Sequence, residues 1–134
     1  MDKNFYITTP IYYPSAKPHM GHAYSSILAD FFARFKRIQG FNVFFLTGTD
    51  EHGQKIQRAA EKEKMDPQSF CDEISETFRK LSKTLNLSNN DFIRTTESRH
   101  LTSASSLWNI LEKNNEIYLS KYSGWYSVSD EAFY

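Results

Sequence analysis

Two histidines and a glycine stand close together in the stretch "KPHMGH", from Lys17 to His22. His19 and His22 lie where a segment with helical periodicity begins, and the unpaired N–H groups and dipole of a helix N-terminus favour anions. Gly21 would let a ligand approach the main chain closely, and the imidazoles can donate hydrogen bonds to anionic oxygens. The stretch therefore predicts a cradle for phosphate groups. It is neither a P-loop nor a G-x-G-x-x-G turn.

A second group of chemically active residues, "TGTDEHG" at positions 47–53, directly follows an apolar run. It presents Asp50, Glu51 and His52 together. A carboxylate at this place suits an ammonium group or a ribose hydroxyl, because a charge-assisted hydrogen bond both orients and discriminates a ligand. Two alternatives stay open at this point. Glu51 and His52 could join the first two histidines around a metal ion, or the histidines could serve only local turns.

Strand and helix patterns alternate along the first hundred residues. Short β-rich or continuous apolar runs predict strands at residues 5–9, 42–47 and 92–96. Periodicity and capping residues predict helices at residues 22–39, from the second group to about 64, and 66–85. Such alternation implies an α/β fold with a doubly wound parallel sheet, in which ligands bind beyond the carboxyl ends of the strands. Both chemically active groups fall at such ends.

The apolar side chains of several segments are expected to pack against other parts of the protein. The stripe Ile27, Phe31, Phe35 and Ile38 is expected to form the apolar face of the first helix and to need a partner, without which this core face would be exposed. The 42–47 strand is expected to be covered on both faces. Cys71 has no partner for a disulfide or a thiolate metal site and is expected to be a small buried hydrophobe. Beyond a helix at 102–114, the aromatic tail predicts a hairpin that turns at Ser123–Gly124.

Length and charge exclude several classes of protein. The 134 residues fit one domain or part of a larger one, and 16 basic against 16 acidic side chains give no net charge. An overall basic field for holding nucleic acid is therefore absent, so no DNA partner is expected, and any RNA contact must be local or made by parts largely absent from these residues. No apolar run approaches the roughly 20 residues that span a bilayer, and no secretory leader is recognisable. The sequence predicts a cytoplasmic protein without a membrane partner.

The two active groups resemble a known family. "PHMGH" resembles the His-Ile-Gly-His signature of class I aminoacyl-tRNA synthetases, with Met20 in the isoleucine place. "TPIYYPSAKPHMGHAY" and "FFLTGTDEHGQKI" are similar to methionyl-tRNA synthetases, and the resemblance covers nearly the whole chain, including "SGWYSVSDEAFY". It implies a Rossmann-like nucleotide-binding fold. Residues 1–115 would be the first half of the catalytic domain, and residues 116–134 the start of its inserted connective peptide. A leucine, valine or cysteine synthetase is the alternative within the class.

The resemblance also implies an activity. The family joins methionine to ATP, releases pyrophosphate, and transfers the methionyl group to the terminal adenosine of its tRNA. Carried over to this chain, His19 and His22 would bind the ATP phosphates and stabilise charge at the α-phosphorus, with magnesium on the phosphates. Gly21 would admit the adenosine.

The remaining site residues follow from the same resemblance. Ile11 and Tyr13 match positions that line the methionine side-chain pocket, and Tyr13 is also expected beside ATP. Asp50 matches the carboxylate that holds the amino acid's ammonium group. The implied supporting residues are Glu51, His52 and Gly53.

Two departures from the family limit what this chain is expected to do. The second family signature, Lys-Met-Ser-Lys-Ser, and the anticodon-binding helices are absent from the 134 residues, so the chain alone is expected to be inactive. A catalytically inert nucleotide- or amino-acid-binding module is the alternative function. Ser127 and Asp130 stand where many members have zinc-binding cysteines, and a serine hydroxyl is a poor zinc ligand. No structural zinc is therefore expected.

Overall fold

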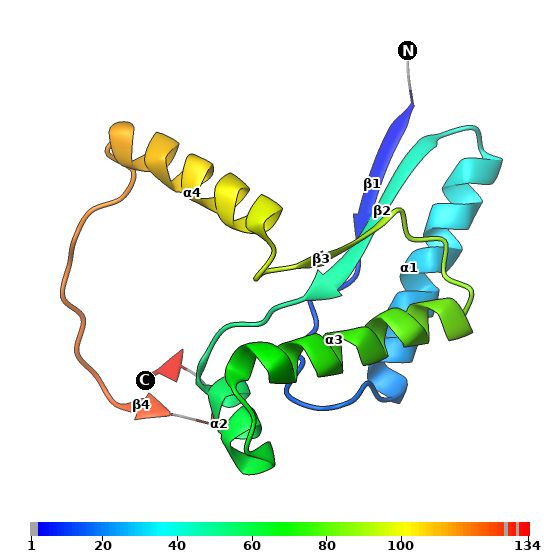
Figure 1. The fold of residues 1–134 in the computed structure, drawn as a ribbon. Helices are drawn as coiled ribbons and strands as arrows, with labels where there is room; N and C mark the ends of the chain where they lie inside the picture. Colours follow the sequence, from blue (N-terminus) through cyan, green and yellow to red (C-terminus); the bar gives the residue numbers. More distant parts are fainter. Residues whose placement is uncertain (1–2, 128, 131) are drawn as a thin grey trace. The chain divides into compact units, whose positions relative to one another are not determined.

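The computed structural model describes residues 3–127, 129–130 and 132–134 (Figure 1). The chain divides into two compact units, Met1–Leu101 and Thr102–Tyr134. The predicted boundary at residue 115 separates the catalytic domain from the inserted connective peptide and is not a boundary between compact units. It stays a prediction. In the described part of the chain, no helix combines the length and the apolar character that a membrane span requires.

A three-stranded parallel sheet organises the first unit. Its strands β1 (Asn4–Thr8), β2 (Asn42–Thr49) and β3 (Asp91–Arg94) stand in the order β1-β2-β3. α1 (Met20–Ile38) connects the first two strands, and α2 (Gln54–Glu63) and α3 (Pro67–Thr84) connect the second to the third. The predicted α/β class with a parallel sheet is confirmed. The carboxyl ends of β1 and β2 point to the end of the sheet at which α1 and α2 begin (Figure 1).

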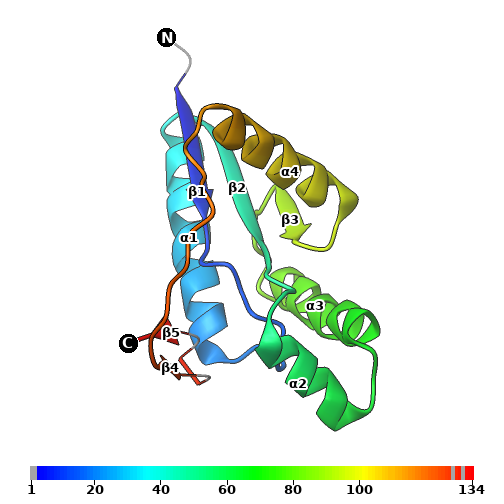
Figure 2. The same cartoon turned by 90° about the vertical axis from the view of Figure 1, so that its left-hand side faces the viewer.

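α1 packs on the sheet through small side chains. Ala29 and Ala33 are buried against Val43 and Phe45 of β2, and both views show α1 running alongside β1 and β2 (Figure 2). Short side chains let the helix backbone lie close to the strands, which fixes where its first turn ends up. The tightness of this contact leaves no room for large side chains on this face of the helix.

The large apolar side chains of α1 lie on its other face and are exposed in this chain, in keeping with the expectation that this stripe needs a partner to cover it. Phe31 is 60% exposed and Ile38 is 84% exposed. Ile27 and Phe35 are exposed as well. Periodicity identified an apolar face, but it could not tell which of two faces meets the sheet, because the alanine face is also compatible with burial.

The sheet itself is covered unevenly. The face that carries Val43 and Phe45 is buried, whereas Tyr6 and Phe44 stack on each other on the opposite face at a ring distance of 5.9 Å and are exposed. The expectation that β2 is covered on both faces is therefore wrong within this chain. β2 is nevertheless the central strand, as predicted.

Side chains of α2 and α3 form a second part of the core. Phe70, Ile74 and Phe78 of α3 pack with Ile56 and Ala60 of α2, as the four-residue spacing in α3 predicts. Cys71 is buried in the same cluster, and burial raises the pKa of its thiol to about 11. This confirms the prediction of an inert buried cysteine.

The second unit contains a helix and a short hairpin. α4 (Ser98–Lys113) begins just before the unit boundary, and β4 (Tyr126–Ser127) pairs antiparallel with β5 (Ala132–Phe133). The predicted turn at Ser123–Gly124 is wrong, because the chain reverses between these strands. Val128 and Glu131 lie outside the described residues. The Ser127 hydroxyl donates to the Asp130 carboxylate at 2.6 Å, which closes the turn locally.

Some of the aromatic side chains of this hairpin pack on one another. The rings of Tyr126 and Phe133 lie 5.0 Å apart, and Tyr122 meets Phe133 edge to face. Trp125, in contrast, is 88% exposed, so it contributes little to the packing of this hairpin.

Candidate active site

His19 and His22 cap the beginning of α1 through each other. The N–H of Gly21 donates to Nδ1 of His19 at 3.0 Å, and the N–H of His19 donates to Nδ1 of His22 at 3.0 Å. This is a capping box in which imidazoles take the place of the usual hydroxyl and carboxylate. The ring centroids lie 3.9 Å apart. The structure therefore brings the two predicted phosphate-binding residues together at a helix N-terminus.

The cap determines the tautomer of both rings. A ring nitrogen that accepts a hydrogen bond carries no proton, so each neutral ring holds its proton on Nε2. Partial burial and the nearness of His19 lower the pKa of His22 below its ordinary value of 6.5. The pair thus offers Nε2–H donors at the positive end of the α1 dipole, a position that favours an anionic oxygen.

Gly21 makes room for the His19 ring. A Cβ atom at position 21 would lie 2.9 Å from Cε1 of His19, closer than non-bonded carbons approach. Any side chain there would push the imidazole out of its capping position. The predicted close approach of a ligand to Gly21 stays a prediction, and the steric need for glycine is an additional reason for the residue.

The residues between β1 and α1 form a shallow depression next to the two histidines. Its volume is about 440 Å³, and Ile11, Tyr13, His19 and His22 contribute to its lining. Ile11 is 47% exposed and Tyr13 is 45% exposed, so both side chains are accessible to a ligand. Four residues that the sequence singled out for ATP or methionine therefore line one concave surface.

Tyr12 is the residue that sequence reasoning missed. Its ring is buried against Phe78, at 5.5 Å between centroids, and against His22 at 4.9 Å. Its hydroxyl lies 2.9 Å from the hydroxyls of both Ser25 and Ser26. The available signal was the alternation in "IYY", since the middle residue of an extended segment points opposite to its neighbours. Tyr12 fixes the loop after β1 against the first turns of α1.

Asp50 is connected to this arrangement through the backbone of Tyr12. The N–H of Asp50 donates to the Tyr12 carbonyl at 2.9 Å, and the N–H of Tyr12 donates to the Gly48 carbonyl at 3.1 Å. The Asp50 side chain is half-buried and accepts a long hydrogen bond of 3.4 Å from the Thr95 hydroxyl. Asp50 does not line the depression of the histidines, but the loops that carry them are joined directly.

Glu51 has a structural role. Its side chain is 0% exposed, and its two oxygens accept from Arg94 at 2.7 and 2.9 Å. The hydroxyls of Thr49 and Thr96 also donate to this carboxylate, at 2.8 and 2.6 Å. Hydrogen bonding to Glu51 raises the pKa of Arg94. Because these hydrogen bonds occupy its oxygens, Glu51 stabilises the loop at residues 47–53 and does not face a ligand.

The alternative that these side chains bind a metal ion has no support in the described residues. Within residues 3–127, 129–130 and 132–134, no three His, Cys, Asp or Glu side chains gather as metal ligands would. His52 is exposed, and its Nε2 lies 3.5 Å from the Thr95 carbonyl. Gly53 begins α2 with a φ of 109°, a conformation that side chains other than glycine rarely adopt. These two residues shape the loop, and their supporting role in the site stays a prediction.

The imidazole cap predicts a pH-dependent stability. Because the folded state lowers the pKa of His22, unfolding takes up a proton below pH 6.5, and the contribution of His22 to stability is lost as the pH falls through that range. His22→Gln keeps an acceptor for the His19 N–H but cannot titrate. Urea midpoints of this variant, measured between pH 7.5 and 5.5, are expected to fall less steeply than those of the parent chain. Parallel curves would refute a titrating cap.

Comparisons with known proteins agree with this geometry. Residues 5–134 match the family model described as tRNA synthetases class I (M). The chain is 55% identical over 134 residues to the methionine–tRNA ligase of Listeria monocytogenes, covering 99% of this chain and 20% of the relative. It is 55% identical over 134 residues to that of Rickettsia felis, covering 100% and 26%. The chain thus spans a fifth to about a quarter of the length of these relatives.

Solved structures give the same result. The Mycobacterium tuberculosis methionyl-tRNA synthetase in complex with methionyl-adenylate superimposes with a TM-score of 0.93 at 45% identity, covering 98% of this chain and 26% of that one. The leucyl enzyme of Agrobacterium radiobacter K84 superimposes with a TM-score of 0.80 at 20% identity, covering 97% and 17%. The second comparison concerns the fold alone.

Proposed function

Because the chain belongs to the class I tRNA synthetase family whose model matches residues 5–134, we propose that the full-length protein joins methionine to ATP and transfers the methionyl group to its tRNA. The observation that carries the proposal is the interlocked cap of His19 and His22. It leaves Nε2–H donors at a helix N-terminus, beside a depression lined by Ile11 and Tyr13.

The two histidines act on the phosphates of ATP. Attack of the methionine carboxylate on the α-phosphorus forms methionyl-adenylate and expels pyrophosphate, and negative charge builds on the phosphate oxygens during this step. Donors that are already fixed in place stabilise such charge without reorganisation. The cap holds both rings through backbone N–H groups, so the His19 and His22 donors are preorganised. Gly21 and Tyr13 complete the ATP side of the site.

Methionine is held by complementary chemistry. Its unbranched thioether prefers apolar and aromatic walls, which Ile11 and Tyr13 supply. Its ammonium group requires an anion, and Asp50 is the available carboxylate, because Glu51 is engaged by Arg94. His52 and Gly53 support the loop that carries Asp50.

The relative crystallised with methionyl-adenylate supports ATP as the second substrate. Magnesium would accompany ATP, bound to its phosphates, and neutralise part of their charge. We propose that the hairpin of the second unit holds no zinc, because Ser127 and Asp130 occupy the places of two ligands and bond to each other. A methionine tRNA is the acceptor, and the cytoplasm is the proposed location.

The 134 residues by themselves are proposed to be inactive, because the family's second ATP-binding signature is absent from them. The alternative is an inert module that binds a nucleotide or amino acid for regulation. The two functions differ in one reaction, since only the ligase exchanges pyrophosphate into ATP in the presence of methionine.

Asp50→Ala in the full-length protein tests the methionine assignment. Loss of a charge-assisted contact of about 1.5–3 kcal/mol is expected to lower kcat/KM for methionine roughly 10- to 150-fold in methionine-dependent pyrophosphate exchange. Glu76→Ala, which removes an exposed carboxylate from α3, is the control and should exchange normally. Near-normal exchange by Asp50→Ala would refute its role, and absence of exchange in the unaltered protein would refute the ligase.

A further inference from the structure

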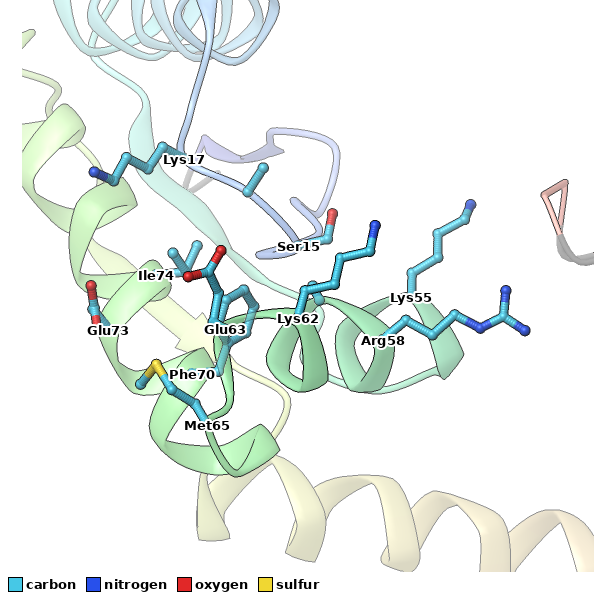
Figure 3. A pocket seen from close by; sticks show the side chains of 12 residues that line it. Ser15, Lys17, Lys55, Arg58, Lys62, Glu63, Met65, Phe70, Glu73 and Ile74 are labelled. Carbon is cyan, nitrogen blue, oxygen red and sulfur yellow. The ribbon is translucent and has the colours of Figure 1, made fainter.

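A second cavity lies behind the loop that leads to the histidines. Its volume is about 670 Å³, and its walls come from residues 15–17, α2 and the beginning of α3 (Figure 3). Its lining is rich in charge. The cationic side chains are Lys17, Lys55, Arg58 and Lys62, and the carboxylates are Glu63 and Glu73.

Three of the cations form one row on α2. Lys55, Arg58 and Lys62 are spaced three and four residues apart, so they share one side of the helix. Their charged ends extend on that side in Figure 3, away from the carboxylates of Glu63 and Glu73. The row is about 10 Å long at 1.5 Å per residue. It is therefore longer than one phosphate group.

The orientation of this row is fixed by the core. Ile56 and Ala60 lie on the opposite side of α2 and are buried in the cluster with Phe70 and Ile74. Rotation of α2 would expose these apolar side chains to water, which is unfavourable. Burial of this apolar side therefore keeps the three cations on the solvent-facing side of α2.

The cavity adjoins the candidate active site. Ser15, Ala16 and Lys17 line both the basic cavity and the depression that contains His19 and His22. A flexible chain of phosphates lying along α2 would need to pass only this loop to reach the histidines. Since the whole chain has no net charge, this concentration of cations is a local feature and not part of a general basic field.

We propose that this basic cavity binds the phosphate backbone of the single-stranded 3′ end of the acceptor tRNA and directs it to the active site. The proposal rests on the proposed function, which requires such an end to approach the adenylate. A row of cations suits successive phosphates of one strand, whereas a small anion would be held by donors that converge on one point. Lys17 contributes to the lining of both cavities.

The test is a double variant of the full-length protein, Lys55→Gln with Lys62→Gln. Two weakened phosphate contacts are expected to lower the affinity for a fluorescein-labelled single-stranded RNA of about 12 nucleotides ending in CCA roughly 5- to 30-fold in fluorescence anisotropy. The slope of log affinity against log salt should become shallower by about 1.4. KM for tRNA in aminoacylation should rise by a similar factor, while tRNA-independent pyrophosphate exchange stays unchanged.

The matched control is Lys80→Gln with Lys83→Gln, which removes the same charge from α3 and should change neither RNA affinity nor KM for tRNA. Equal RNA affinity in the two double variants would overturn the proposal. Displacement of the RNA from the unaltered protein by submillimolar pyrophosphate would also overturn it, in favour of a small-anion site. The RNA-binding arm does not require catalysis. A protein that binds RNA through these lysines but performs no exchange would refute the proposed ligase and leave the RNA site standing.

Discussion

Replacing His19 with asparagine in the full-length protein is expected to lower kcat of methionine-dependent pyrophosphate exchange by about 100- to 1,000-fold. Loss of one preorganised donor to a developing oxyanion has an effect of this size. Asparagine is a good N-cap, so its side-chain oxygen can replace Nδ1 of His19 as the acceptor for the Gly21 N–H. Its amide does not extend to the position of the imidazole Nε2–H. Stability and catalysis are thereby separated in one variant.

His19→Ala supplies the comparison. It removes both the cap and the donor, so kcat should fall as in the asparagine variant and the protein should also lose about 1 kcal/mol of stability. Melting temperatures and steady-state exchange kinetics distinguish the two variants. If His19→Asn raised KM and left kcat intact, His19 would contribute to ATP binding alone and not to the transition state.

Replacing Arg94 with methionine is expected to lower the free energy of unfolding by about 3–5 kcal/mol. Arg94 is the cation that balances the fully buried carboxylate of Glu51, and without it two hydroxyls alone would face that charge. Asp72 would lose the same partner, but its side chain is half exposed and water can replace Arg94 there. Urea unfolding of the purified chain measures the loss.

A second substitution tests the cause of this loss. Glu51→Leu combined with Arg94→Met removes both charges, so most of the stability should return. If the loss of unfolding free energy in the double variant equalled the sum of the losses in the two single variants, the ion pair would not be the cause of the destabilisation. The N–H of Glu51 donates to Thr95, whose hydroxyl also reaches Asp50. Arg94→Met alone should therefore also displace the Asp50 carboxylate, the proposed partner of the substrate ammonium group.

Local patterns predicted a large part of this molecule. Each strand and helix of the first unit was recognisable because alternation, four-residue spacing and caps are determined by residues close in sequence, as with Asp66 before α3. The nearness of His19 and His22 was likewise predictable, because residues separated by three positions lie within one helical turn of each other. The tautomers could not be predicted, because they depend on which backbone N–H groups the rings accept from.

Contacts between distant residues were not predictable. Glu51 was expected to support a ligand site, and its partner Arg94 lies 43 residues away. Nothing in "GTDEHG" distinguishes a carboxylate that faces a ligand from one that faces an arginine. The face of α1 that meets the sheet could not be predicted for a related reason. Choosing between its alanine face and its phenylalanine face requires knowledge of how closely the helix approaches the sheet.

The exposed phenylalanine face of α1 has a consequence for synthesis on the ribosome. The matched relatives are about four to five times as long as this chain, so most of a protein of their length is synthesised apart from these residues. At about 5–20 residues per second, a nascent chain presents Phe31 and Phe35 to water until a segment that covers them has been synthesised. The helix that places the histidines would therefore carry on its other side an apolar surface that favours aggregation until it is covered.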